Sequence, residues 1–517
     1  MVSVETCFLT EAAKGVGIAP ITLKRWLLEG RFPEVERDRN GWRIFTQENI
    51  QRIKAFAQKQ SLHGPIQLSL YQDNGSAVYE DKTASFRDSA FNGNKKLPFH
   101  RWVPWIAGFS SNFVEDCFRN YLDPSIPALE VTILDPFAGV GTTLTEGIMH
   151  GYNVVGFEIN PYAYLACKIK LSARGLDARL VDEQLQRFLH YYAVRAADKD
   201  YKPRSGPPDK FGTRIAFFSP KVQRKALIVI DYLPNIQNLE VRELFQLAFG
   251  TVMVSFSNYS YEPSLGRRES SGKENILDAP VEQILAAKIR DMSSDIKEFE
   301  ELYGEVASNS KTQVFNETFF KALDFCEEET VDLLVTSPPY LNNYHYLRNT
   351  RPQLFWLGMA NDPKDLRPIE QQSFGKFWQT VRDQETIPLE FHHTSLEKKL
   401  ELLRKINSDR KTYGGHGWAN YAATYFNDSY RFCEVLSKLL KPTGTAVVVI
   451  GNSILQGLEI KTDEIFADIG ELVGLRKKDI ILLRTKRTGS SIVDSSVRAA
   501  KTKKQTPLYE TAVVLGR

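Results

Sequence analysis

Two spacings of apolar residues divide the chain into helical and strand-like stretches. Between Phe8 and Ala57, apolar positions recur three or four residues apart, as in amphipathic helices, and Leu23, Trp26 and Leu27 form one such face. Short, largely apolar runs bounded by turn residues, such as those at 131–134, 154–157 and 331–335, predict buried strands. Helical patterns separate these runs, so most of the chain is expected to form an α/β fold.

The first part of the chain predicts a compact helical unit followed by a hairpin. A short helix and a Gly-containing turn precede Pro20, which can stand in the first turn of a second helix. Asn40-Gly41 then gives a strong hairpin signal, and Thr46 can cap a further helix. This order of elements is that of a helix-turn-helix with a wing.

These residues resemble the DNA-binding domain of the MerR family of regulators, in which the second helix enters the major groove and the wing grips the backbone. The resemblance implies double-stranded DNA as a partner. It places the following residues at DNA: Thr22, Lys24 and Arg25 on the second helix, and Arg37, Arg39 and Arg43 on the wing. A helical docking module with a solvated basic face is the alternative.

A β-α-β pattern with a Gly-rich turn lies between residues 131 and 158. The apolar strand at 131–134 runs into this turn, and a second strand ends in Glu158. Gly139 and Gly141 let a ligand approach the backbone, and Glu158 can accept hydrogen bonds from ribose hydroxyls. Neither G-x-G-x-x-G nor G-K-[ST] occurs here, so a nucleoside-containing cofactor other than a dinucleotide is predicted.

The turn "DPFAGVGTT", residues 135–143, resembles the D-P-F-x-G-x-G-T-T signature of S-adenosylmethionine-dependent amino-methyltransferases. The resemblance implies that the loop holds the methionine part of S-adenosylmethionine and that Glu158 holds the ribose. It also implies a preceding helix, capped by Ser110 or Ser111, whose Phe109 and Ser110 close over the cofactor. Core packing is the alternative for the aromatic residues there.

A third strand and a helix are expected at 314–329, with Asn316 or Thr318 near the adenine of the cofactor. The predicted cofactor-binding residues are therefore Asp135, Phe137, Ala138, Gly139, Gly141, Thr142, Thr143, Glu158, Asn316, Phe109 and Ser110.

The strand at 331–335 ends in "TSPPY", residues 336–340. Two prolines remove two amide donors, so the peptide carbonyls of this turn can point at a ligand. If the Ser337 hydroxyl and the Pro338 carbonyl accept the two hydrogens of an exocyclic amine, the nitrogen lone pair can be aimed at a methyl sulfonium. Tyr340 offers a ring for stacking a flipped base, worth about 1–3 kcal/mol in comparable sites.

The T-S-P-P-Y turn resembles the catalytic motif of DNA methyltransferases that act on the N4 amine of cytosine, which implies Ser337, Pro338, Pro339 and Tyr340 as catalytic residues. Adenine-N6 enzymes more often carry Asp or Asn at the Ser337 position. Methylation at carbon 5 of cytosine needs a Pro-Cys pair, which the sequence lacks. Adenine-N6 methylation, RNA amine methylation and an inactive DNA-binding regulator remain alternatives.

The resemblance covers residues ~100 to 170 and ~312 to 517. It implies a Rossmann-like, seven-stranded methyltransferase sheet, mostly parallel with an antiparallel last strand. Such enzymes commonly serve restriction-modification or related defence systems, and no nuclease signature occurs here, so a restriction endonuclease or other defence subunit would be a separate chain.

The stretch between the two motifs is far longer than two strands and helices require, so an insertion is predicted. The predicted divisions are a winged helix-turn-helix at 1–58, a linker or extended arm at 59–96, a cofactor half at 97–172, a mostly helical insertion at 173–310 and a catalytic half at 311–517 with an excursion at about 361–417. Since the catalytic motif normally comes first when these two motifs occur together, the segment that reads the target stays open.

A basic loop interrupts the expected final pair of antiparallel strands, "DIILLR" and "YETAVVLGR". Between Arg484 and Gln505 it holds seven Lys or Arg residues, which could grip DNA phosphates. The candidates are Arg484, Lys486, Arg487, Lys501, Lys503 and Lys504. A solvated hairpin tip is the alternative.

The overall composition restricts the class of protein and the kinds of site that can be expected. The residues are 42% hydrophobic and 25% charged, as in soluble globular proteins, and the net charge of +3 means that a nucleic-acid surface must come from local clusters. The five cysteines show no C-x-x-C spacing, so neither a zinc site nor a disulfide framework is expected. No apolar run approaches the ~20 residues of a membrane helix and no secretory signal is present, so a cytoplasmic protein is expected.

Overall fold

The computed structural model describes residues 6–7, 9–16, 23, 27, 35–36, 43–61, 86–87, 91–105, 108–261, 264–341, 346–486 and 507–517. The chain divides into two compact units. One comprises Met1–Thr83 with Glu298–Glu305, and the other comprises Ala84–Lys297 with Val306–Arg517. Among the described residues, no helix combines the length and the apolar character needed to cross a membrane.

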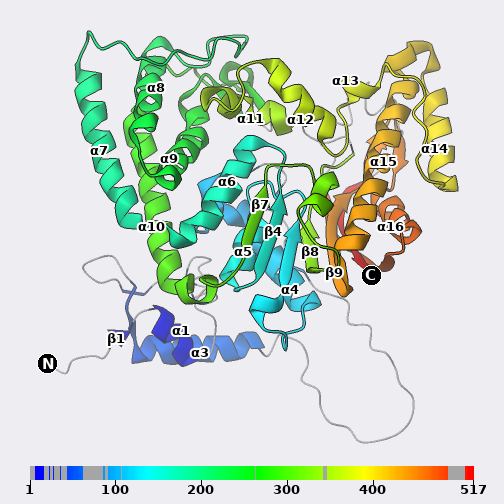
Figure 1. The fold of residues 1–517 in the computed structure, drawn as a ribbon, viewed down its shortest axis with the longest axis horizontal. Helices are drawn as coiled ribbons and strands as arrows, with labels where there is room; N and C mark the ends of the chain where they lie inside the picture. The colour runs from blue at the N-terminus through cyan, green and yellow to red at the C-terminus, as the bar shows by residue number, and fades with distance from the viewer. Residues whose placement is uncertain are drawn as a thin grey trace, which may run out of the picture. The chain divides into compact units, whose positions relative to one another are not determined.

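The larger unit is built on one central sheet, which in the described residues has the strand order β12-β13-β9-β8-β3-β4-β7 (Figure 1). The strands are β3 (Thr132–Asp135), β4 (Asn153–Phe157), β7 (Thr312–Phe315), β8 (Val331–Thr336), β9 (Leu440–Gly451), β12 (Arg476–Lys486) and β13 (Leu508–Gly516). Strands β7, β4, β3, β8 and β9 run parallel, and β13 is antiparallel to both of its neighbours. The predicted α/β fold with a mostly parallel sheet is confirmed.

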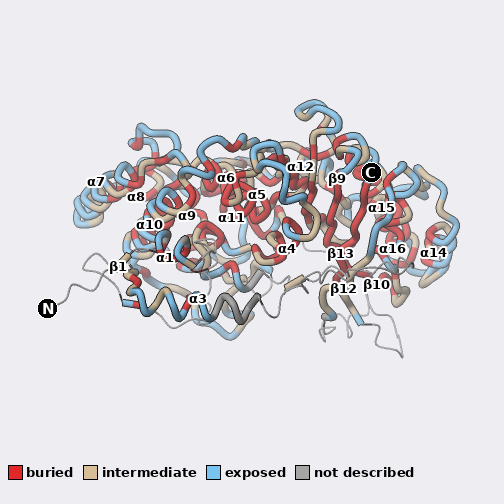
Figure 2. Tube along the Cα trace, turned by 90° about the horizontal axis from the view of Figure 1, so that it is seen from below, coloured by how far each residue is buried: buried red, intermediate tan, exposed pale blue. Residues whose placement is uncertain are grey.

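Helices cover the sheet, which explains why inner strands such as β3, β8 and β13 are largely buried. The helices from α4 to α16 are α4 (Ser111–Tyr121), α5 (Thr142–Met149), α6 (Pro161–Ser172), α7 (Ala178–Ala197), α8 (Pro220–Tyr232), α9 (Leu239–Val252), α10 (Val281–Ala307), α11 (Tyr346–Trp356), α12 (Arg367–Gln372), α13 (Trp378–Val381), α14 (Thr394–Lys405), α15 (Gly415–Leu439) and α16 (Thr462–Leu472). Buried residues concentrate along β9 and β13 (Figure 2).

Local sequence signals set several helix starts. Ser110 Oγ accepts a hydrogen bond from Phe113 N at 3.2 Å, so the predicted serine cap of α4 is confirmed at Ser110. Asn160 caps α6 in the same way, and Pro161 occupies the first helical position, where the missing N–H costs nothing.

The third strand begins slightly earlier than expected, at Thr312, and the helix expected after it is only the short 3-10 helix η8 (Phe319–Asp324). Strand β9 starts at Leu440, which pairs with Val331 of β8.

The stretch predicted as an insertion contains helices α7 to α10 and a small hairpin formed by β5 (Tyr259–Tyr261) and β6 (Leu265–Arg267). Helices α7, α8 and α9 stand on the side of the sheet that carries β7, whereas α14, α15 and α16 stand on the side that carries β9 (Figure 1). A second hairpin, β10 (Ser453–Leu455) and β11 (Leu458–Ile460), follows β9.

The smaller unit contains α1 (Leu9–Val16), α3 (Gln47–Ser61) and a two-stranded pair, β1 (Thr6–Cys7) and β2 (Phe45–Thr46). Leu23 and Leu27, predicted to face inward, are buried in its core with Ala12, Ala13, Phe45 and Ile53. Thr46 and Asn49 cap α3 reciprocally, which confirms the predicted cap. Ile44 N donates to Glu36 O at 2.9 Å. The predicted turn at Asn40-Gly41 lies outside the described residues.

Candidate active site

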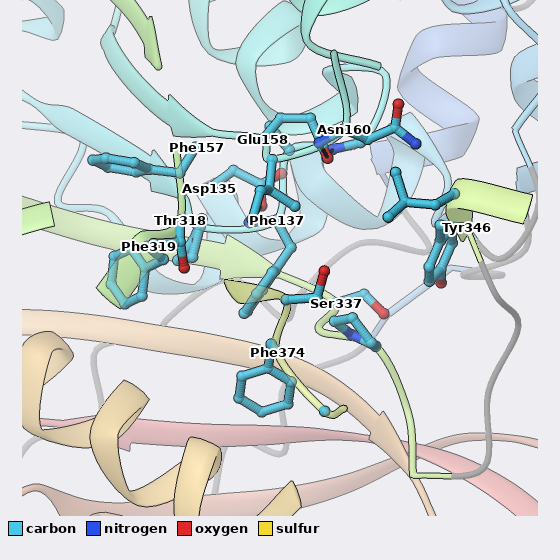
Figure 3. Close-up of a pocket in the computed structure, with 18 of the residues that line it drawn as sticks. Asp135, Phe137, Phe157, Glu158, Asn160, Thr318, Phe319, Ser337, Tyr346 and Phe374 are labelled. Atoms are coloured by element: carbon cyan, nitrogen blue, oxygen red, sulfur yellow. Dashed lines mark hydrogen bonds between the residues drawn. The ribbon is translucent and has the colours of Figure 1, made fainter. Parts of the chain in front are cut away.

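A cavity opens at the carboxyl ends of β3, β4 and β8. From β3 the chain runs to β4 and β7 on one side, and it then crosses to β8 on the other side. Such a switch point is where doubly wound sheets bind ligands. Figure 3 shows Asp135, Glu158 and Ser337 around this cavity.

The two sequence motifs meet in this cavity. The predicted residues that line it are Phe109, Asp135, Phe137, Ala138, Gly139, Thr142, Glu158, Ser337 and Pro339. Other predicted residues lie beside the cavity rather than in its lining, namely Ser110, Gly141, Thr143, Asn316, Pro338 and Tyr340. The roles assigned to all of these residues stay predictions.

Asp135 joins the two motifs. Its carboxyl group is almost fully buried, and Oδ1 accepts hydrogen bonds from Thr336 Oγ1 at 2.6 Å and from Phe137 N at 3.1 Å. Burial raises the pKa of Asp135 to about 6, although these hydrogen bonds act in the opposite direction. Asp135 therefore fixes the start of the Gly-rich turn against the end of β8.

Glu158 closes the turn from the other side. Its two carboxyl oxygens accept hydrogen bonds from Gly139 N and Asn160 N, each at 2.7 Å. Burial raises the pKa of Glu158 to about 7. Since a carboxylate has about four acceptor positions, Glu158 can still accept hydrogen bonds from a ligand in the cavity.

The glycines of the turn are required by its conformation. Gly139 and Gly141 have φ angles of +53° and +80°, a region that residues with a side chain rarely adopt. A Cβ atom at Gly139 would lie 3.0 Å from Nε1 of Trp105, which also lines the cavity. Thr143 Oγ1 donates to Val335 O at 3.1 Å and so holds the start of α5 against β8.

Two residues of α6 support the same turn, a role that was not predicted from the sequence. Lys170 Nζ donates to Val140 O at 2.6 Å, and Cys167 Sγ donates to Gly139 O at 3.1 Å. Burial lowers the pKa of Lys170 to about 8. The available signal was the presence of two lysines, Lys168 and Lys170, in the otherwise apolar stretch "YAYLACKIKL".

Asn316 does not line the cavity but supports the strand end beside it. Its Nδ2 donates to the carbonyls of Glu158 and Ile159, at 2.8 and 3.2 Å, and so steadies the end of β4. The next three residues, Glu317, Thr318 and Phe319, line the cavity instead. Of the two residues expected near the adenine, the structure places Thr318 in the lining.

The excursion after α11 supplies one wall of the cavity, which the sequence did not predict. Phe374 and Glu370 line the cavity, and the Phe374 ring lies 5.2 Å from that of Phe137 in an edge-on contact. The neighbouring Gly375 N donates to Asp428 on α15 at 3.0 Å. This wall is therefore anchored to the helix that precedes β9.

The T-S-P-P-Y turn divides its side chains between the cavity and the sheet. Ser337 and Pro339 line the cavity, whereas Tyr340 donates its hydroxyl hydrogen to Glu510 Oε1 at 3.2 Å. Burial, assisted by Glu510, raises the pKa of Tyr340 well above its usual range. The aromatic rings of Trp105 and Tyr346, whose centroids are 6.1 Å apart, stack at the cavity.

Most of the predicted DNA contacts lie outside the described residues: Thr22, Lys24, Arg25, Arg37, Arg39, Arg487, Lys501, Lys503 and Lys504. Arg43 is described and is half-buried, and Lys486 is described only as part of β12. Arg484 forms an ion pair with Glu510, so its charge is already compensated within the sheet. The phosphate contact expected for Arg484 stays a prediction.

Comparison with known proteins yields two kinds of similarity. Residues 8–64 match the family described as MerR HTH family regulatory protein. The chain is also 23% identical over 485 residues to the Type II methyltransferase M.BsoBI of Geobacillus stearothermophilus, covering 85% of this chain and 91% of the relative.

Two further relatives carry the same type of name. The Type II methyltransferase M.AvaI of Nostoc sp. (strain PCC 7120) is 23% identical over 425 residues, covering 78% of this chain and 84% of its own. M.MvaI of Kocuria varians is 22% identical over 397 residues, with 73% and 82% covered. No solved structure matches the chain.

Proposed function

We propose that this protein is a site-specific DNA methyltransferase that transfers a methyl group from S-adenosylmethionine to the exocyclic amine of a flipped base, with cytosine N4 as the target. The observation that carries the proposal is the meeting of the Gly-rich turn, Glu158 and Ser337 in one cavity. Relatives named Type II methyltransferases, which align with most of the chain, support the same assignment.

The lining of the cavity fits S-adenosylmethionine. Glu158 offers carboxylate oxygens for ribose hydroxyls, and Glu317 and Thr318 stand beside it at the ends of β4 and β7. Phe137 and Phe374 provide apolar surface for the adenine ring. Bound there, the cofactor supplies an electrophilic methyl group. The indole of Trp105 lies next to Gly139 of the turn.

Ser337 and Pro338 give the reaction its acceptors. An exocyclic amine is a weak nucleophile because its lone pair is delocalised into the base. When Ser337 Oγ and the Pro338 carbonyl accept its two hydrogens, the lone pair is localised and held in one direction. Trp105 and Tyr346 line the cavity beside Ser337 and can stack on a base that has left the duplex.

The MerR-like module supports duplex DNA rather than RNA as the substrate, since this type of module reads the major groove. By analogy with the relatives named Type II methyltransferases, we propose that the protein is the modification component of a restriction-modification or related defence system. A separate chain would provide the endonuclease.

Transfer of labelled methyl groups tests the proposal. Purified protein, S-adenosylmethionine with a labelled methyl group and duplex DNA of mixed sequence should give labelled DNA. The variant Ser337→Ala should retain cofactor binding but lose at least about 100-fold in turnover, because one acceptor for the amine is removed. Label that enters RNA but not DNA, or a Ser337→Ala variant with unchanged turnover, would refute the assignment.

A further inference from the structure

A chain of hydrogen bonds runs from the cavity to the antiparallel strands β13 and β12. Ser337 Oγ donates to the hydroxyl oxygen of Tyr340 at 3.5 Å, and Tyr340 donates to Glu510 Oε1 at 3.2 Å. Arg484 Nε donates to the other oxygen of Glu510. The first distance is at the long end of the range, and hydrogen bonds of active sites often shorten when substrate binds.

The position of Glu510 is set by the antiparallel strand β13. Because β13 runs opposite to β8 and β9, its beginning lies at the edge of the sheet where β8 and β9 end. Glu510 pairs with Gly451 of β9 and is only 4% exposed. A buried carboxylate is costly unless it is paired, and Arg484 compensates its charge.

Gly451 makes the close approach possible. A Cβ atom at this glycine would lie 2.6 Å from Tyr509 O, 3.5 Å from Cε2 of Tyr340 and 3.6 Å from Cγ of Glu510. A side chain here would therefore displace the strand backbone beside Tyr340. The ends of strands β8, β9 and β13 therefore pack closely around Tyr340 in the protein interior.

The carboxylate gives the chain of hydrogen bonds a direction. An ionised carboxyl group accepts hydrogen bonds and cannot donate them, so Tyr340 must donate to Glu510. The phenolic oxygen of Tyr340 is then left to accept from Ser337. Once its hydrogen is committed to Tyr340, Ser337 Oγ can only accept hydrogen bonds on the cavity side.

We infer that Glu510 is a positioning residue that acts through Tyr340 and keeps Ser337 as an acceptor for the hydrogens of the target amine. The inference rests on the proposed methyl transfer and deepens it. It also assigns Arg484 to the support of Glu510 and gives Tyr340 a polar role that is separate from stacking on a base.

The variant Glu510→Gln tests this direction. An amide of the same shape can donate to Tyr340, which would let Tyr340 donate to Ser337 and would turn the Ser337 hydrogen toward the cavity. We expect a fall in kcat of roughly 10- to 100-fold with little change in the KM for S-adenosylmethionine. Glu510→Asp, which keeps an acceptor-only group, should retain more activity than Glu510→Gln.

A double-mutant cycle with Tyr340→Phe separates positioning from general structural support. In the Tyr340→Phe background the chain of hydrogen bonds from Ser337 to Glu510 is already broken. Glu510→Gln should therefore change single-turnover rates by less than about twofold. The matched control is Glu459→Gln, since Glu459 is a half-buried carboxylate that accepts from Asn452 Nδ2 at 2.8 Å. It should keep wild-type kcat.

Four outcomes would be informative. Equal rate losses from Glu510→Gln in the wild-type and Tyr340→Phe backgrounds would contradict the positioning role of Glu510. A Glu510→Gln variant with wild-type kcat would contradict it as well. If Glu510→Gln does not fold, as judged by cofactor titration and denaturation, the comparison of Glu510→Asp with wild type in both Tyr340 backgrounds replaces it. If wild-type protein transfers no methyl group, the proposed function fails before the positioning role of Glu510 is tested.

Discussion

Thr336 Oγ1 donates a hydrogen bond to Asp135 Oδ1 at 2.6 Å, although the two residues are 201 positions apart in the chain. The contact joins the end of β8 to the end of β3, so the T-S-P-P-Y turn and the Gly-rich turn share one buried hydrogen bond. Two motifs that lie far apart in the sequence are thereby held at a fixed distance.

Removal of this hydrogen bond should weaken both the fold and the site. Thr336→Val keeps the shape of the side chain but leaves Asp135 with one donor fewer. We expect a loss of about 1–3 kcal/mol in the free energy of unfolding, measured by denaturant titration, and weaker cofactor binding. Thr213→Val, which removes an exposed hydroxyl bonded to Ile215 O, is the control and should change neither quantity. Equal effects of the two substitutions would contradict the role of Thr336.

The pKa of Glu158 predicts how cofactor affinity depends on pH. Ribose hydroxyls donate to the ionised carboxylate, and the pKa of Glu158 is about 7. Affinity for S-adenosylmethionine should therefore rise as pH increases from 6 to 8, and the Glu158→Gln variant should bind more weakly with a flatter profile. Calorimetric titrations across this range measure both effects. A wild-type profile as flat as that of the variant would contradict the assignment of Glu158.

The carboxyl group of Glu158 should also make the free energy of unfolding depend on pH. This free energy should fall as pH rises, whereas cofactor affinity should increase. The unfolded pKa of a glutamate is about 4.3, so between that value and about 7 the folded protein holds the extra proton. Its contribution to stability is complete below the unfolded pKa and is lost as pH rises through 7. The unliganded wild type should thus lose more free energy of unfolding than Glu158→Gln as pH rises from 5 to 8.

Gly139→Ala should impair cofactor binding. The substitution forces a side chain into a φ of +53° and places a Cβ atom 3.0 Å from Trp105, a strain of about 1–2 kcal/mol or more. We expect at least a roughly fivefold weaker affinity in equilibrium binding. Gly206→Ala, at a glycine with no atom near the added Cβ, should leave affinity unchanged. A Gly139→Ala variant with wild-type affinity would show that the turn does not contact the cofactor.

The amino-terminal unit should bind DNA independently of the cofactor site. Leu23 is fully buried in the core of this unit, so Leu23→Asp places an unpaired charge there and should unfold it. DNA affinity in a mobility-shift assay should fall, whereas S-adenosylmethionine affinity should not. Gln51→Asp makes the same charge change at an exposed position and serves as the control. Unchanged DNA binding by Leu23→Asp would remove the module from the DNA interface.

Sequence patterns predicted those parts of the site that are contiguous in the chain. The Gly-rich turn before α5 and the turn after β8 each contain their own signals, namely glycines, prolines and polar residues at strand ends. Lys170, Phe374 and Glu510 were missed as parts of the site because each reaches it from another element. Their contacts depend on how α6, the excursion and β13 pack against the sheet, which no local pattern reveals.

The prediction for Tyr340 shows the same limit. Its ring type and its place after two prolines indicated stacking, but the polar partner that orients its hydroxyl lies 170 residues away. Likewise, Arg484 belongs to a run of basic residues that suggested phosphate binding, and its pairing with Glu510 follows from the register between β12 and β13. Long-range pairing decides the role of such residues.

Nucleoside mass spectrometry identifies the methylated base and so tests whether this protein methylates cytosine N4 in DNA. Duplex DNA and total RNA would each be incubated with the purified protein and isotopically labelled S-adenosylmethionine, then digested and analysed. We expect label in N4-methylcytosine of DNA. Label in N6-methyladenine would keep the enzyme class but contradict the target base, and label confined to RNA, or to neither nucleic acid, would contradict the proposed function itself.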